Sequence, residues 1–183
     1  MLVAICESYP DERSRPLGRG TWRRYHTEMT YFFTYGDRMS SERMAQFAPD
    51  ATLVGAARLT GYRLAFNVAS RAWGGGAANA VPDPRASMWG VLWDISDDDT
   101  TGLDSFRGDD EIAHGVVDVT VEGPRGSLPA KTLVVTTDGG FIRPNERYVA
   151  MLRANAERQG LPEEALQAID EAAAGPSGRA ASI

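Results

Sequence analysis

The stretch Thr30–Met44, TYFFTYGDRMSSERM, joins an aromatic run to a glycine turn and the start of a helix. Aromatic residues dominate positions 31–35 and favour a β-strand, and Gly36 supplies the backbone freedom that a turn requires. Ser40 or Ser41 is suited to cap a helix whose first amides point back toward that turn. Strand, tight loop and helix in this order predict either a small pocket for an anion such as a carboxylate, or simply the first strand and turn of a globular domain.

The length and composition are those of one ordinary globular domain. The 183 residues are enough to bury a core, and Cys6 is the single cysteine, so no internal disulfide is expected. The formal net charge of -6 argues against a general nucleic-acid binder and against binding to an anionic membrane surface. No window approaches the roughly 18 to 20 apolar residues that span a bilayer. We therefore expect a cytoplasmic protein, and the arginine bias, with Lys131 the only lysine, is typical of a high-GC bacterial genome.

Composition divides the chain into three parts. Residues 1-28 are rich in proline, glycine and arginine and have no sustained period, which predicts an N-terminal arm that is disordered or draped over the surface. Met29 is an alternative biological start, and Trp22 and Tyr25 are the side chains that would pack the arm onto the body. Residues 29-174 form the predicted domain, and residues 175-183 a flexible tail.

Within the domain, periodicity and turn signals predict a mostly antiparallel or mixed sheet with short helices outside it. The fold class is α+β, with the sheet closed into a small barrel or sandwich. The expected elements are a helix at 40–48, two strands with a bend within 51–68, a glycine loop at 74–76, two strands separated by a two-proline turn up to 96, a capped helix from about 97 to 107, a hairpin of 114–122 and 130–136, and helices at 145–159 and 162–174.

Several common site chemistries find no support. The two histidines, His26 and His114, lie far apart in sequence, so no metal site is expected. The acidic run at 97–99 fits the N-terminus of a helix better than a cation site. There is no GxSxG elbow for a hydrolase, and the run at 74–76 lacks the Lys-Ser/Thr of a nucleotide-binding loop. It is either a flexible surface loop or a close backbone approach, and no cofactor is expected.

Six segments in order carry a more specific signal. They are YFFTYGDRM, ARLTGYRLAF, SRAWGGGAANAVPD, MWGVLWDIS, LDSFRG and ERYVAMLRANAERQGLP. Together they resemble the γ-glutamylcyclotransferase (AIG2-like) family, from about Tyr31 to Ala172. Members of that family carry YGSN in the first loop, W-x-GG-x-A in the middle, a VWGV strand, LD-x-x-EG and a late helix ending in GLP. The resemblance implies a small mixed β-barrel with flanking helices.

The resemblance also implies a reaction. The α-amine of a γ-glutamyl group attacks its own γ-carbonyl, which expels an amine or amino acid and forms 5-oxoproline. Such a site needs a pocket for the α-carboxylate, backbone N–H donors near the developing oxyanion, and one carboxylate that carries the proton to the leaving nitrogen. In relatives the glycine-turn loop supplies the first two, and the Glu of LD-x-x-EG is the acid/base.

This chain departs from the family pattern at both places that touch substrate. Arg107 occupies the acid/base position, and a guanidinium with a pKa above about 12 cannot accept a proton near neutrality. In the first loop, Asp37 and Arg38 stand where Ser and Asn are usual. One hypothesis is that Asp37 and Arg107 pair across the site.

Two functional interpretations follow. In the first, the protein is an enzyme on a γ-glutamyl or other anionic amino-acid-derived small molecule, with Asp37 or Glu111 carrying the proton and Arg38 or Arg107 holding a carboxylate bidentately. In the second, it is a catalytically retired member that binds a small anionic ligand or a protein partner. The sequence indicates no oligomeric state. The predicted catalytic residues are Arg107, Asp37 and Glu111, and the predicted substrate-binding residues are Thr34, Tyr35, Gly36, Asp37, Arg38, Met39, Trp73, Gly75 and Tyr148.

Overall fold

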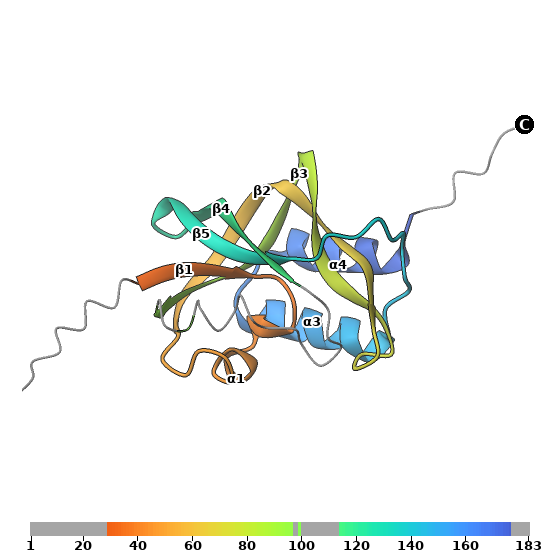
Figure 1. Ribbon diagram of the computed structural model, residues 1–183, viewed down its shortest axis with the longest axis horizontal. Coiled ribbons are helices and arrows are strands. Elements are labelled where there is room, and N and C mark those ends of the chain that lie inside the picture. Colours follow the sequence, from red (N-terminus) through yellow and green to blue (C-terminus); the bar gives the residue numbers. More distant parts are fainter. Residues whose placement is uncertain (1–28, 97–98, 100–113, 177–183) are drawn as a thin grey trace, which may run out of the picture.

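Five strands form a closed barrel in the computed structural model, which describes residues 29–96, 99 and 114–176 (Figure 1). Around the barrel the strand order is β1-β3-β2-β4-β5. The predicted arm 1-28, most of the predicted helix at about 97–107 and most of the predicted tail lie outside the described residues. The strands are β1 Met29–Thr34, β2 Thr52–Ser70, β3 Gly75–Ser96, β4 Gly115–Gly123 and β5 Gly126–Val134. The predicted small mixed barrel with short helices outside it is confirmed.

The barrel closes where its first and last strands meet. β1 pairs antiparallel with β3 on one side and parallel with β5 on the other, with Phe32 opposite Lys131 and Phe33 opposite Thr132. The remaining neighbours, β2 with β3, β2 with β4 and β4 with β5, are antiparallel. The predicted hairpin over the glycine turn is confirmed as β4 and β5, with Gly123 opposite Gly126. Because β1 is flanked on both sides, the loop that follows it starts from the seam of the barrel.

The strands β2 and β3 are longer than the sequence predicts. The expected pair of strands within 51–68 is one strand, and the two expected strands before residue 96 are also one; register shifts interrupt their pairing at three places. Where Thr60 pairs with Ser87 and Tyr62 with Pro82, β2 has one unpaired residue and β3 has four. The prediction of a reversing two-proline turn was therefore wrong. The prolines lie at a large bulge, which bends the strand while pairing resumes beyond it.

The aromatic run of β1 is buried on both faces. Phe33 is fully buried with Leu59, Leu92 and Val121 in one apolar cluster, whereas Phe32 belongs to the cluster that includes the helix residues Tyr148 and Leu152. Successive side chains of a strand point to opposite faces. This explains why aromatic residues follow one another in β1 without the polar alternation of a half-exposed strand.

The helices lie outside the barrel. They are the 3-10 turn η1 Asp37–Met39 and the helices α1 Ser41–Met44, α3 Glu146–Arg158 and α4 Glu163–Ala174. In Figure 1, α3 and α4 lie together on one side of the barrel, while η1 and α1 follow directly from β1. Asn145 caps α3 by accepting a hydrogen bond from the Arg147 amide at 2.9 Å. The two C-terminal helices are confirmed, but the helix expected at 40–48 has one α-helical turn.

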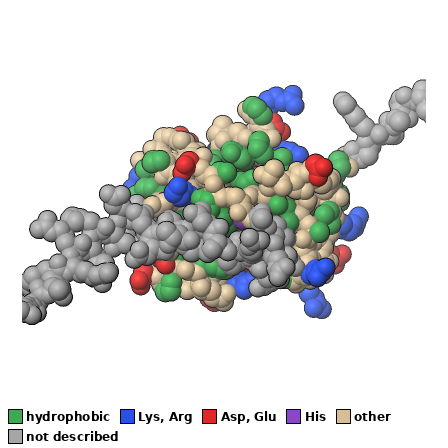
Figure 2. Space-filling view, in the orientation of Figure 1, with side chains coloured by type: hydrophobic (Ala, Val, Ile, Leu, Met, Phe, Trp, Pro, Cys, Tyr) green, Lys and Arg blue, Asp and Glu red, His purple; other side chains and the backbone are tan. Residues whose placement is uncertain are grey.

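Three further features bear on the sequence-based expectations. Ser96 accepts a hydrogen bond from the Asp99 amide at 3.2 Å, which is the capping contact predicted for the next helix. Basic and acidic side chains are interspersed on the face shown in Figure 2, and no patch of one sign stands out there. In the part of the chain that the structure describes, no helix has the length and apolar character to cross a membrane.

Candidate functional site

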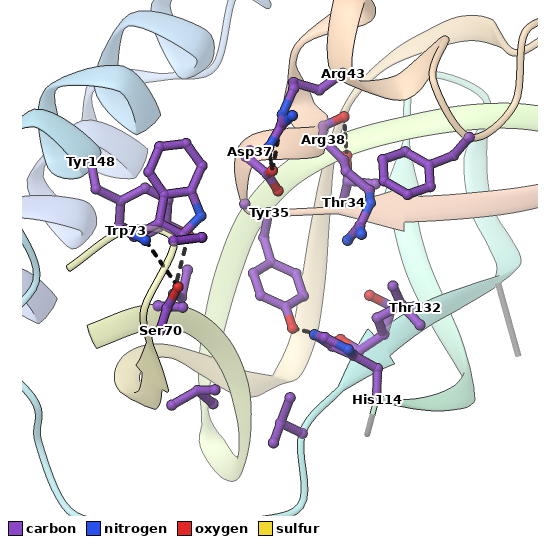
Figure 3. Close-up of a pocket in the computed structure, with 18 of the residues that line it drawn as sticks. Thr34, Tyr35, Asp37, Arg38, Arg43, Ser70, Trp73, His114, Thr132 and Tyr148 are labelled. Atoms are coloured by element: carbon purple, nitrogen blue, oxygen red, sulfur yellow. Dashed lines mark hydrogen bonds and ion pairs between the residues drawn. The ribbon is translucent and has the colours of Figure 1, made fainter. Parts of the chain in front are cut away.

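A cavity of about 180 Å³ lies beside the loop that follows β1. Its walls come from the β1–η1 loop, α1, the turn between β2 and β3, α3 and the seam strand β5 (Figure 3). Seven of the predicted substrate-binding residues line it: Thr34, Tyr35, Gly36, Asp37, Arg38, Trp73 and Tyr148. Segments more than a hundred residues apart therefore meet at the loop where the sequence predicts an anion pocket.

Asp37 and Arg43 form the main ion pair of the cavity. The Arg43 Nε and Nη2 atoms donate to the same Asp37 oxygen, Oδ2, at 3.2 and 3.1 Å. The Asp37 side chain is 19% exposed and that of Arg43 is 36% exposed. The Arg43 guanidinium also lies over the Trp73 ring, 5.9 Å from its centroid, in cation–π range. Arg43 was not among the predicted site residues, because the sequence does not show which side of the helix expected at 40–48 meets the pocket.

Trp73 and Tyr148 make an aromatic wall. Their rings stack at 4.6 Å between centroids with an interplanar angle of 29°, and Phe66 meets Tyr148 edge-on at 6.1 Å. The Tyr148 hydroxyl accepts a hydrogen bond from the Ala78 amide at 3.3 Å. Burial raises the pKa of Tyr148, and the nearby Asp37 carboxylate raises it further. The phenol therefore stays neutral and presents a dipole to the cavity.

Tyr35 spans the middle of the cavity. Its hydroxyl donates to the Leu133 carbonyl of β5 at 2.5 Å, and Figure 3 shows the ring extending from the β1–η1 loop toward Thr132 and His114. Burial raises the pKa of Tyr35 to about 12, despite a hydrogen bond with the Ala80 backbone and the nearby Arg38 cation. This phenol too is neutral near physiological pH, and its hydrogen bond holds the β1–η1 loop to β5 across the site.

Arg38 supplies a second guanidinium on the cavity wall. It lies over the Phe47 ring, 4.2 Å from the centroid. Burial lowers the pKa of Arg38, and the neighbouring Asp37 carboxylate opposes that shift. A guanidinium held in a half-buried site is suited to a carboxylate ligand, because it presents paired N–H donors and stays charged. Among the described lining residues, Asp37 is the only carboxylate, against Arg38 and Arg43.

The helix α3 holds the loop from behind. The Gln159 side-chain amide donates to the Met39 carbonyl at 2.8 Å, and Asn155 approaches the Asp37 carbonyl at 3.5 Å. Met39 itself is 1% exposed and belongs to the core. The structure thus gives Met39 a packing position behind the loop and does not bring its side chain into the cavity lining.

The glycine run after Trp73 is a close backbone approach. A Cβ at Gly76 would lie 2.1 Å from the Ile142 carbonyl oxygen, and one at Gly75 would lie 2.7 Å from the Arg143 carbonyl oxygen. The Gly76 amide donates to that same Arg143 carbonyl at 3.0 Å. Gly75 is not among the described residues that line the cavity. It serves the site by letting the Trp73 turn pack against the segment that leads into α3.

Three other site predictions meet different outcomes. Arg107 and Glu111 lie outside the described residues, so the proposed Asp37–Arg107 pair stays a prediction. His114, considered in the sequence only as a metal ligand, lines the cavity just before β4. In the described ranges no group of three or more His, Cys, Asp or Glu side chains is placed to hold a metal ion.

The chain is similar in sequence to known proteins. Residues 87–169 match the model of the AIG2-like family. The chain is 27% identical to a γ-glutamylcyclotransferase from Bos taurus over 141 residues, 75% of each protein. It is also 27% identical to the one from Homo sapiens over 150 residues, 78% of this chain and 80% of that protein. The chain is a γ-glutamylcyclotransferase-like protein.

A solved structure supports the same assignment. A structure described as a γ-glutamyl cyclotransferase superposes with a TM-score of 0.70 at 26% identity, covering 78% of this chain and 87% of that one. In this γ-glutamylcyclotransferase-like chain, the AIG2-like match begins in the second half of β3, ends within α4 and includes Tyr148. It begins after the loop that carries Asp37 and Arg38, where the sequence departs from the family pattern.

Proposed function

We propose that this chain binds the amino-acid end of a γ-glutamyl compound in the cavity and converts it to 5-oxoproline with release of an amine or amino acid. One observation carries the proposal: the loop and helix after β1 present one carboxylate and two guanidinium groups within a single aromatic-walled cavity. An α-amino acid carries one cation and one anion on the same carbon. The charges of the cavity complement both.

Arg38 is the group we assign to the α-carboxylate of the substrate. Its guanidinium stacks on Phe47, so little side-chain freedom is left to lose when a carboxylate binds. Asp37 is the group we assign to the α-ammonium. Both hydrogen bonds from Arg43 end on its Oδ2 atom, and Oδ1 has no partner among the residues that the structure describes. In this arrangement the ammonium approaches Oδ1 while Arg43 fixes the carboxylate plane.

The proton route differs from that of the family in this proposal. The resemblance puts Arg107 where relatives have the acid/base Glu, and a guanidinium cannot take up that role. Asp37 and Glu111 are the carboxylates that the sequence offers instead. A biosynthetic role, such as removal of a γ-glutamyl group from an intermediate, is compatible with the same chemistry.

A retired, ligand-binding function is the second candidate. The ion pair with Arg43 favours it, because both of its hydrogen bonds already occupy one oxygen of the carboxylate that would carry the proton. In that case the cavity would bind a small anionic amino-acid derivative without turnover. A protein partner is a weaker fit for a cavity of this size.

The experiment that tests the proposal is incubation of the full chain with γ-glutamyl-alanine, γ-glutamyl amines and glutathione, with 5-oxoproline as the readout. Calorimetry with each compound measures binding separately. Turnover in the wild type supports the enzyme, and binding without turnover supports the retired function. Turnover that appears only in Arg107→Glu would overturn a relocated proton route.

A further inference from the structure

We propose that Trp93 raises the affinity for the α-carboxylate of the substrate by fixing Arg38 through the hydroxyl of Thr34. Trp93 is a positioning residue, and it is not among the described residues that line the cavity. The inference rests on the proposed function, which assigns the α-carboxylate to Arg38. It concerns MWGVLWDIS, residues 88–96 of β3, a segment that carries part of the family resemblance and has no role in the proposed function.

Three polar groups meet the hydroxyl of Thr34. The Trp93 Nε1 atom donates a hydrogen bond to Thr34 Oγ1 at 3.0 Å. The hydroxyl also lies 3.3 Å from the carbonyl oxygen of Arg38 (Figure 3) and 3.3 Å from the carbonyl oxygen of Val91. The side chains of Thr34 and Trp93 are both buried. The hydroxyl therefore connects the indole of β3 to the backbone of the residue that carries the guanidinium.

The indole determines the direction in which the hydroxyl donates. An indole N–H can only donate, whereas a hydroxyl has one proton and two acceptor lone pairs. Because Trp93 occupies an acceptor position of Thr34, the Thr34 proton points toward the two carbonyl oxygens. The hydrogen bond from Trp93 thus favours the contact between Thr34 and the carbonyl of Arg38.

A close approach of β3 to the end of β1 makes this contact possible. A Cβ at Gly90 would lie 2.3 Å from the Thr34 carbonyl oxygen and 2.6 Å from the ring of Phe33. Thr34 is opposite Val91, in the final pair of the β1–β3 ladder. The hydroxyl therefore lies at the point where β1 leaves the sheet, with Trp93 three residues beyond the glycine. Gly90 allows β3 to pack against the residue from which the loop of residues 35–39 starts.

The backbone around Arg38 is held from two sides. Thr34 contacts the Arg38 carbonyl, and Gln159 of α3 donates to the carbonyl of Met39 at 2.8 Å. The guanidinium lies over the Phe47 ring, 4.2 Å from its centroid. Without the Thr34 contact, the backbone at Arg38 loses one of these hydrogen bonds, and more freedom is lost when a carboxylate binds. We expect this cost to appear in the affinity and not in the chemical step.

The test compares the wild type with Trp93→Phe, Thr34→Val and Thr34→Ser. Calorimetry gives the Kd of γ-glutamyl-alanine, and release of 5-oxoproline gives kcat and KM. We expect Trp93→Phe and Thr34→Val to raise Kd and KM by about five- to ten-fold, which corresponds to the loss of one hydrogen bond. The expected change in kcat is less than about two-fold. Thr34→Ser keeps the hydroxyl, so its Kd should stay within about two-fold of the wild-type value.

A double-mutant cycle tests whether the effect passes through Arg38. Arg38→Gln removes the guanidinium, so the effect of Thr34→Val should disappear in that background. The cycle is measured on kcat/KM, which needs no saturation with substrate. We expect Thr34→Val to lower kcat/KM by about five- to ten-fold in the wild type and by less than about two-fold in Arg38→Gln. A role of Thr34 in stability alone would give the same loss in both backgrounds.

A matched control separates affinity from stability. Ile95 is a fully buried residue of β3 and is not among the described residues that line the cavity. Ile95→Val removes one buried methylene group, which lowers stability without touching the Thr34 hydroxyl. Its Kd should stay within about two-fold of the wild-type value. Thermal unfolding of each variant checks that it folds, and Thr34→Val provides the test on its own if Trp93→Phe does not fold.

The outcomes separate this inference from the proposed function. Wild-type affinity in Thr34→Val or in folded Trp93→Phe overturns the inference alone, as does an equal rise of Kd in Ile95→Val or in Thr34→Ser. A full effect of Thr34→Val in Arg38→Gln also overturns it. Binding without turnover in the wild type overturns the catalytic part of the proposed function, and the Kd values of the variants then decide the inference. Absence of binding by all three compounds overturns both.

Discussion

Arg43 donates two hydrogen bonds to a single oxygen of Asp37, although the two residues belong to different turns after β1. The pair fixes the carboxylate plane and links α1 to residues 35–39, the proposed substrate loop. Because the Arg43 side chain is about a third exposed, we expect a double-mutant cycle of Asp37→Asn and Arg43→Gln to give a coupling free energy of unfolding of about 0.5 to 1 kcal/mol. Denaturant unfolding of the four proteins measures it. A coupling near zero would contradict a structural role for the pair.

Replacing Trp73 tests the aromatic wall. Trp73→Leu removes the ring stacked on Tyr148 and the surface beneath the Arg43 guanidinium. We expect the free energy of unfolding to fall by about 1 to 3 kcal/mol and the affinity for γ-glutamyl-alanine to weaken. Trp73→Phe, which keeps a stacking ring, should retain most of both. Trp89→Phe is the matched control, since Trp89 bonds Glu164 through its Nε1 and does not line the cavity; an equal loss of affinity there would argue against the wall.

A methyl group at Gly76 should strain the Trp73 turn. The added Cβ would lie 2.1 Å from the Ile142 carbonyl oxygen. Because this oxygen belongs to the backbone, a change of side-chain rotamer cannot relieve the clash. We expect Gly76→Ala to lower the free energy of unfolding by about 3 kcal/mol. Gly140→Ala is the control, because a Cβ there has nothing within 4 Å. Equal thermal midpoints for the two variants would show that the close approach costs nothing.

The amide of Gln159 anchors the substrate loop through the Met39 carbonyl. Gln159→Ala should lower the free energy of unfolding by about 1 kcal/mol and weaken ligand binding, because the loop that carries Asp37 and Arg38 loses a fixed point. Gln167→Ala, at an exposed position of α4, serves as the control for composition and helix propensity. Calorimetric titration measures the ligand affinity of both variants. Equal affinities would mean that the hydrogen bond from Gln159 to Met39 does not affect ligand binding.

The phenol of Tyr35 predicts a specific pH dependence. Its pKa is raised from 10.0 to about 12 in the folded chain, so the unfolded chain releases this proton first as the pH rises. The free energy of unfolding should therefore fall between pH 10 and pH 12, with the stabilisation complete below pH 10. Tyr35→Phe should show a shallower fall over that range. Tyr148→Phe should do likewise, since burial also raises the pKa of Tyr148. An unchanged slope in both variants would contradict the shifts.

The sequence predicted those parts of the fold that depend on neighbouring residues, such as single strands, tight turns and helix caps. The aromatic run of β1, the hairpin of β4 and β5 and the Asn145 cap follow from residue types and turn residues. The sequence could not reveal that β2 and β3 each run unbroken past their glycines and prolines. Gly61 and Pro82 are residues typical of turns, but β2 and β3 pair on both sides of the bulge, so each continues as one strand.

The candidate site was also predicted only in part. The first loop could be predicted because it is one continuous stretch, and the resemblance added Trp73 and Tyr148. Arg43 and His114 could not, because their place on the wall depends on α1 folding back over the loop and on closure of the barrel. The spacing of residues in the sequence predicts neither the position of α1 nor the closure of the barrel. The isolated histidine gave no periodic or paired signal of a site.

The hydrogen bond from Tyr35 to the Leu133 carbonyl joins residues 98 positions apart across the seam of β1 and β5. Contacts of such sequence separation form slowly, since a long chain segment must first be ordered. During synthesis, the substrate loop would leave the ribosome long before the strand that completes its cavity. Ligand binding therefore requires a chain that has emerged at least through β5, so a bound ligand would stabilise only molecules whose barrel has already closed.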